Sequence, residues 1–82
     1  NYPNPFNAGT VINYSIPASA ANSHVILEIF DVQGRKVAEL VNRTMPAGNY
    51  STRWEANTSS GTYMYRLKVG DKIRTGKMIL AK

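Results

Sequence analysis

The chain has no cysteine among its 82 residues. Disulfide cross-links, thiol nucleophiles and cysteine-ligated zinc sites are therefore excluded. The sequence also has a single histidine, His24, with no second histidine and no cluster of carboxylates near it. Because a metal ion in a protein needs several such ligands together, we expect no metal site. A lone histidine at the start of a strand is expected to be a surface or capping residue.

Long apolar runs and catalytic motifs are missing as well. The longest apolar stretches, such as Val25-Ile26-Leu27, are far shorter than the roughly 20 residues of a membrane-spanning helix. The sequence contains no glycine-rich phosphate loop and no Gly-x-Ser-x-Gly turn around a serine nucleophile. Two of the five acidic residues, Asp31 and Asp71, have the surroundings of turn residues. We therefore expect a protein that is not an enzyme, with no catalytic residue and no cofactor.

The composition is that of a small globular domain. Hydrophobic residues make up 43% of the chain and charged residues 18%, which argues against disorder. Ten Lys and Arg residues against five Asp and Glu give a net charge of +5. This excess permits contact with anionic partners such as phosphate-bearing glycolipids or nucleic acid. The basic residues do not cluster, however, so solvated strand faces and protected sheet edges are the favoured explanation, and no nucleic-acid partner is expected.

The opening of the chain, Tyr2-Pro3-Asn4-Pro5, lacks the basic and then apolar pattern of a signal peptide. We expect residues 1–82 to form one domain that is a fragment of a longer protein, with any targeting peptide lying upstream.

Alternation of apolar and polar residues predicts strands along the first half of the chain. The first two cover residues 10–16 and 24–31, with a loop after Pro17 between them. A third strand is expected at 35–41, although the apolar spacing there also fits a helical stripe. Residues 42–48, which include a proline and a glycine, are predicted to form a loop.

The second half continues the pattern, with strands expected at 50–55, 61–69 and 73–82. The last two strands form a closing hairpin. Gly70 occupies the first central position of its turn, which suits a type II′ turn. Residues 1–6 contain two prolines and can only form an edge strand or an extended strap.

Six or seven short strands without a long helix predict an all-β fold, an immunoglobulin-like or fibronectin-like antiparallel β-sandwich of about seven strands. The alternation places most aromatic residues among the inward positions, so packing is favoured over a stacking platform for sugars or bases. The expected core consists of Ile12, Tyr14, Ile16, Val25, Leu27, Ile29, Val37, Leu40, Tyr50, Trp54, Tyr63, Tyr65, Leu67, Met78 and Leu80.

Five segments, in their order along the chain, match the pattern of one family. They are Asn1-Tyr2-Pro3-Asn4-Pro5-Phe6-Asn7 with the strand after it, Phe30-Asp31-Val32-x-Gly34-Arg35-x-Val37, Ala47-Gly48-Asn49-Tyr50 with Arg53-Trp54, Ser60-Gly61-Thr62-Tyr63 with the strand it opens, and Lys77-Met78-Ile79-Leu80-x-Lys82. From residue 1 to residue 82, the chain thus resembles the C-terminal sorting domains, type A, of the type IX (Por) secretion system.

The chain departs from that pattern at two places. Phe30 replaces the usual tyrosine, and Ala8-Gly9 stands where the family more often has Pro-Ser or Pro-Thr. A related immunoglobulin-like domain of flagellar hook-capping proteins shares much of the Gly-Arg and Gly-x-Tyr pattern.

The resemblance implies a non-catalytic secretion signal that directs an exported cargo protein through the outer membrane of a Bacteroidetes-type bacterium. Its partners would be the outer-membrane translocon and a surface sorting peptidase, which usually removes the domain. The cargo would then be released or joined to an anionic lipopolysaccharide. The implied location is the periplasm in transit, and afterwards the outer surface or the medium.

In that family the last two strands carry the signal, which points to Gly61, Tyr63, Lys77 and Lys82 for translocon recognition. Gly61 can take a positive φ at the strand entry, and Tyr63 would anchor the hairpin in the core. The two lysines would project charge from an edge strand that a receptor can read by strand addition. A purely structural role, with Gly61 in a turn, Tyr63 in the core and both lysines protecting an edge, is the alternative for each residue.

Two other functions remain open from the sequence. The first is a β-sandwich module that binds carbohydrate or cell wall and is appended to a secreted hydrolase. The second is a structural module of a flagellar cap. Outward-facing aromatic residues would favour the first, and there Phe30 is the main candidate.

Overall fold

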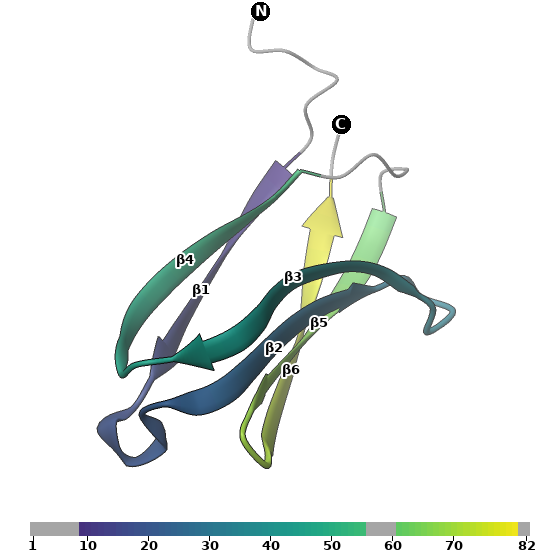
Figure 1. The fold of residues 1–82 in the computed structure, drawn as a ribbon. Helices are drawn as coiled ribbons and strands as arrows, with labels where there is room; N and C mark the ends of the chain where they lie inside the picture. Colours follow the sequence, from purple (N-terminus) through teal and green to yellow (C-terminus); the bar gives the residue numbers. More distant parts are fainter. Residues whose placement is uncertain (1–8, 56–60, 81–82) are drawn as a thin grey trace, which may run out of the picture.

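The computed structural model describes residues 9–55 and 61–80, which form two antiparallel sheets (Figure 1). The elements are β1 (Gly9–Ile16), a short 3-10 helix η1 (Ala18–Ala20), β2 (Ser23–Phe30), β3 (Lys36–Met45), β4 (Gly48–Glu55), β5 (Gly61–Val69) and β6 (Lys72–Leu80). β1 pairs with β4, and the second sheet has the strand order β3-β2-β5-β6. The predicted all-β sandwich is confirmed. The strap expected at residues 1–6 lies outside the described residues.

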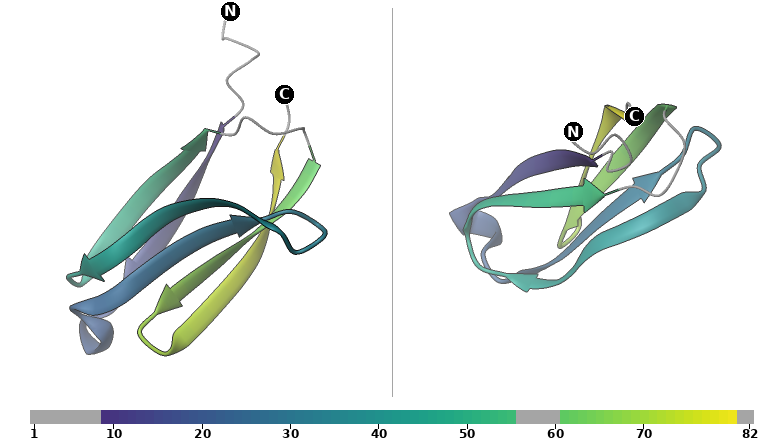
Figure 2. Two further views of the ribbon diagram at one scale, coloured as in Figure 1. Left: turned by 45° about the vertical axis from the view of Figure 1, so that its right-hand side comes forward. Right: turned by 90° about the horizontal axis from the view of Figure 1, so that it is seen from above.

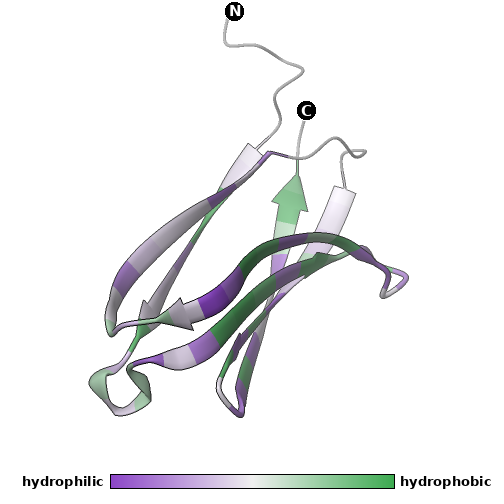
Figure 3. Ribbon diagram, in the orientation of Figure 1, coloured by the Kyte–Doolittle hydropathy of each residue, from purple (hydrophilic) through white to green (hydrophobic). Residues whose placement is uncertain are grey.

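The core lies between the β1–β4 pair and the inner face of the four-stranded sheet (Figure 2). Val25, Leu27 and Ile29 on β2 are completely buried. Removing such a side chain from water contributes about 1.5–3 kcal/mol to folding. Figure 3 shows the same concentration of apolar residues along the middle of β2 and β3. β2 is therefore the strand around which the rest of the domain packs.

Aromatic rings connect the strands and the two sheets. In the β1–β4 pair, Tyr14 lies opposite Tyr50, and their rings stack with centroids 5.7 Å apart. Trp54 of β4 meets Tyr63 of β5 edge to face, with centroids 5.0 Å apart. Each such pair contributes about 0.5–1.5 kcal/mol beyond its buried area. The second pair joins the two sheets.

The inward positions predicted from alternation are all buried or partly buried. Ile12, Tyr14, Ile16, Val25, Leu27, Ile29, Trp54, Tyr63, Leu67 and Leu80 are buried, and Val37, Leu40, Tyr50, Tyr65 and Met78 pack partly buried against them. Two further core residues, Val41 and Met45, were not predicted. Both belong to β3.

The loop predicted at residues 42–48 is wrong, as is the helical alternative before it. β3 continues to Met45 and leaves Pro46 and Ala47 as the connection to β4. The pairing of β2 with β3 shifts twice, leaving Leu40 and Val37 as extra residues opposite the shifts. Such bulges interrupt the period-two alternation, which is why the apolar spacing imitates a helix.

Two turns fix the hairpins. In the β5–β6 turn, Gly70 has a φ of 61°, and Asp71 is not among the residues with positive φ. This combination of signs is that of the predicted type II′ turn. In the β2–β3 turn, the carboxylate of Asp31 accepts hydrogen bonds from the backbone N–H groups of Gln33 and Arg35. The hydrogen bond from the Arg35 backbone is the main cause that lowers the pKa of Asp31.

Replacement of Met45 by alanine tests the extension of β3 into the core. Met45 is 1% exposed, so we expect Met45→Ala to lower the free energy of unfolding by about 2–4 kcal/mol, because it leaves a cavity. The matched control is Met64→Ala, because Met64 is 43% exposed and should cost less than about 1 kcal/mol. Urea unfolding followed by circular dichroism measures both. Equal losses in the two variants would contradict the position of Met45.

Candidate functional site

The closing hairpin of β5 and β6 lies at one side of the four-stranded sheet (Figure 1). β5 pairs with β2 on one side and with β6 on the other. Within the described ranges, 9–55 and 61–80, β6 has β5 as its sole pairing partner. The hairpin is thus anchored through β5, and in the part of the chain that the structure describes β6 is the edge strand of its sheet.

Gly61 and Tyr63 lie at the base of this hairpin. Gly61 begins β5 opposite Leu80, and its φ of 153° is a conformation that residues with side chains rarely adopt. Tyr63 is 6% exposed and packs against Trp54. Together with the β2–β3 turn they line a shallow hollow of about 260 Å³.

Lys77 lies on the opposite face of the sheet from Tyr63. It pairs with Met64, whose side is the outward one, and its side chain is exposed. Lys82 lies outside the described residues. The structure therefore places Gly61, Tyr63 and Lys77 in one hairpin without gathering them into one cluster.

The outward face of the hairpin carries apolar residues that the sequence interpretation did not single out. Ile73 is 57% exposed and Ile79 is 74% exposed. For Ile79 the signal was present in the sequence, because it lies between the inward Met78 and Leu80, whereas Ile73 lies between Lys72 and Arg74. Figure 3 shows apolar residues at the end of β6, where Met78, Ile79 and Leu80 follow one another.

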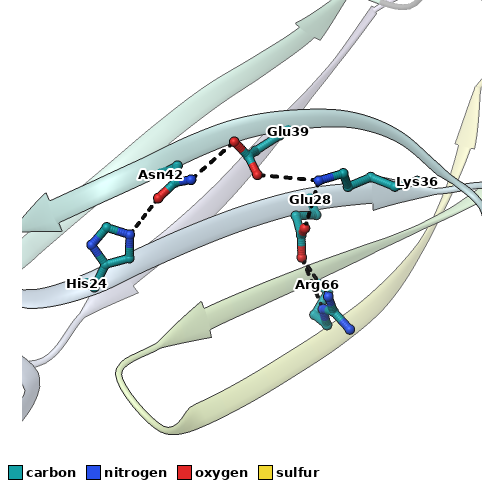
Figure 4. A network of polar contacts seen from close by, with 6 residues as sticks. All are labelled: His24, Glu28, Lys36, Glu39, Asn42 and Arg66. Atoms are coloured by element: carbon teal, nitrogen blue, oxygen red, sulfur yellow. Dashed lines mark hydrogen bonds and ion pairs between the residues drawn. The ribbon is translucent and has the colours of Figure 1, made fainter.

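A network of charges covers the outward face of β2 (Figure 4). Glu28 is 9% exposed and accepts a hydrogen bond of 2.8 Å from Arg66 Nη2, with Lys36 Nζ at 3.4 Å. Arg66 also lies over the ring of Phe30, 4.9 Å from its centroid. Lys36 continues the network to Glu39. The network joins β3, β2 and β5 across the sheet.

The ionisation of Glu28 is tied to this network. The hydrogen bond from Arg66 is the main cause that lowers the pKa of Glu28, with a smaller contribution from Lys36, while burial acts in the opposite direction. Since the folded-state pKa lies below the unfolded one, the stabilisation is complete above the unfolded value near 4.5 and is lost as the pH falls through the folded value.

Gly76 lets the two strands of the hairpin close on each other. It lies opposite Tyr65, and a Cβ at this position would overlap the Tyr65 ring. The ring covers the bare backbone of β6, which is a known way of stabilising a glycine near a sheet edge. The hairpin is thereby held in the middle of its length.

The described part of the chain offers no group of three or more His, Cys, Asp or Glu side chains that could hold a metal ion. In the same residues, no helix has the length and apolar character needed to cross a membrane.

The comparisons identify the family. The family model of the secretion system C-terminal sorting domain matches residues 1–81. The chain belongs to this family. It is a sorting domain of type IX secretion, a non-catalytic class whose members interact with the secretion machinery and are exported to the cell surface or secreted. A search of curated proteins and a search of solved structures gave no match to this sorting domain.

Removal of the Glu28 charge tests the network. Glu28→Gln should lower the free energy of unfolding by about 1–2 kcal/mol at neutral pH, because the ionic hydrogen bonds to Arg66 and Lys36 are lost. The variant should also lose less stability than the wild type between pH 5 and pH 3. Thermal unfolding at several pH values measures both effects.

The matched control for this prediction is Glu55→Gln. Glu55 pairs with Arg53, but the two side chains are 64% and 52% exposed. Solvent screens such a pair, so the change should cost less than about 0.5 kcal/mol. Equal losses in the free energy of unfolding for the two substitutions would show that the Glu28 network does not stabilise the sheet.

Proposed function

We propose that this sorting domain is the C-terminal secretion signal of a longer exported protein and directs that cargo through the outer membrane. Its partner in this step is the outer-membrane translocon of the type IX system. The observation that carries the proposal is the family match over residues 1–81. The position of β6 at the edge of a sheet, within the described residues, supports the hairpin as the recognised part.

The hairpin has the properties that recognition by another protein requires. Tyr63 and Tyr65 hold β5 in the core, so the hairpin keeps one shape. β6 offers main-chain groups at its edge, to which a receptor strand can add. Lys77 adds a charge on the outward face, and we assign Gly61, Tyr63, Lys77 and Lys82 to this recognition.

The proposed course follows from the family. Residues 1–82 act as one domain, fold in the periplasm and reach the cell surface with the cargo. A surface sorting peptidase then removes the domain, and the cargo is released or joined to an anionic lipopolysaccharide. The domain performs no reaction in these steps.

No observation favours the carbohydrate-binding alternative. The large exposed apolar residues of the described part are Val11, Val32, Met64, Ile73 and Ile79, none of them aromatic. Phe30, the main outward candidate, is partly buried and has Arg66 over its ring. A sugar platform needs an accessible aromatic face, which these side chains do not supply.

An export assay tests the proposal. A reporter with a signal peptide, fused to residues 1–82, should reach the surface of a host that has a type IX system. Deletion of residues 77–82 should leave the reporter in the periplasm, because the fusion has lost the end of β6 and both lysines. Fractionation and protease treatment of intact cells locate the reporter. Normal export of the truncated fusion would contradict the assignment.

Point variants separate recognition from folding in the same assay. Lys77→Ala combined with Lys82→Ala should lower surface exposure of the reporter about tenfold, if each lysine contributes a typical interface charge. Lys68→Ala is the control, because Lys68 is an exposed lysine of β5 on the same outward face. All fusions should unfold at similar temperatures. Equal loss of export in the control and the double variant would contradict a specific role of the two lysines.

A further inference from the structure

The two sheets leave a cleft between β1 and the inner face of the β5–β6 hairpin. Its volume is about 430 Å³, and residues of β1, β5 and β6 line most of it. This volume lies within the usual range of ligand sites in proteins. The cleft lies toward the Gly70 turn, because Lys72 and Val69 line it.

The floor of the cleft is apolar. Tyr14 and Leu67 contribute from the two sheets, and both belong to the buried core. Tyr65 and Val69 are partly buried beside them. A ligand in the cleft would thus cover apolar surface that is continuous with the core.

The rim of the cleft is cationic. Lys72 and Arg74 lie opposite Val69 and Leu67, at inward positions of β6, yet both side chains are exposed. Neither forms an ion pair with an acidic side chain among the residues that the structure describes. The cleft therefore combines an apolar floor with two available positive charges.

The β1 side of the cleft offers main-chain groups. Asn13 and Ser15 line it, but their side chains form hydrogen bonds to Ser51 and Asn49 on the other face of the β1–β4 pair. Because these two side chains are engaged on the other face, we take the contribution of Asn13 and Ser15 to the cleft to be their main chain at the edge of β1. In the described residues, β1 pairs with β4 and with no other strand. This edge is suited to accept an added strand.

We propose that the cleft binds an extended segment of the translocon that carries apolar residues and an acidic residue on the same face, at every second position. The segment would pair with the edge of β1, place its apolar side chains on Tyr14 and Leu67, and bring a carboxylate to Lys72 and Arg74. This inference rests on the proposed function for the source of the segment. A small amphiphile would use the floor and the charges and leave the edge of β1 unpaired.

A second copy of the chain fits the cleft poorly. The chain has five acidic residues, and Glu28, Asp31, Glu39 and Glu55 already form ion pairs. Two copies would also bring together two chains of net charge +5. Charge complementarity thus favours an acidic partner strand over self-association.

The first test uses a synthetic peptide, blocked at both ends and as long as β1, which has 8 residues. Valines and one glutamate occupy every second position, so that they share one face, and serines fill the positions between them. Titration into the labelled 82-residue chain, followed by NMR, should shift the amide signals of residues 11–15 and 72–74. A peptide with lysine in place of glutamate should bind about tenfold more weakly. Equal binding of the two peptides, or shifts confined to other strands, would overturn the proposal.

The matched variants are Arg74→Glu and Arg43→Glu. Both arginines are exposed and lie at inward positions of edge strands, Arg74 on β6 and Arg43 on β3 at the other side of the same sheet. Arg74→Glu should weaken binding of the acidic peptide about tenfold, whereas Arg43→Glu should leave it unchanged. Arg74→Lys should bind the acidic peptide as the wild type does, because the positive charge is kept. Thermal unfolding of each variant checks that the fold is kept.

The same variants in the export assay connect the cleft to secretion. Arg74→Glu should lower surface exposure of the reporter, and Arg43→Glu should not. If the wild-type fusion is not exported, the proposed function fails, while the peptide titration still decides whether the cleft binds such a strand. If the wild type and Arg74→Glu are exported equally, the cleft proposal fails and the sorting function stands. A chain that lacks residues 1–8 provides a last comparison. If the peptide binds this shortened chain but not the full chain, residues 1–8 themselves occupy the cleft, and the proposal is overturned.

Discussion

The pairing of β2 with β5 is the interaction on which the rest of the domain depends. It joins the β2–β3 hairpin to the β5–β6 hairpin in a register that runs from Val25 opposite Val69 to Phe30 opposite Met64. On the inner face it buries Leu27 against the core, and on the outer face it brings Arg66 to Glu28. Because β6 contacts the sheet through β5, this pairing decides where the hairpin proposed for recognition is held.

Alternation in the sequence predicts much of this fold for a simple physical reason. In a strand with one buried face, apolar residues must occupy every second position. β1, β2 and β5 follow this pattern, so their inward residues can be identified without a structure. β3 does not follow this alternation at Leu40 and Val37, where bulges add a residue to the strand. A bulge depends on how two strands pair, and the spacing within one strand does not reveal it.

The hairpin residues of the candidate site can be predicted from the sequence, whereas the cleft cannot. The positions of Tyr63 inside and Lys77 outside follow from alternation along β5 and β6. The cleft does not, because it arises where β1 and β6 approach from distant parts of the sequence. Lys72 and Arg74 have the sequence context of solvated turn and edge residues, and the role proposed for them depends on the apolar floor beside them. Local patterns thus identify the hairpin, while the surface that could receive a partner depends on the packing of the two sheets.

We propose that the export machinery recognises the closing hairpin, in which β5 is held in the sheet and β6 is the edge strand among the described residues. Hydrogen exchange of the backbone amides, measured for the domain alone and in complex with the purified translocon, tests it most directly. We expect the amides at the edges of β6 and β1 to exchange quickly in the free domain and to become protected in the complex, while those of β2 and β5 exchange slowly in both states. Protection of amides in β3 and β4, with those of β6 and β1 unchanged, would show that the machinery does not bind this hairpin.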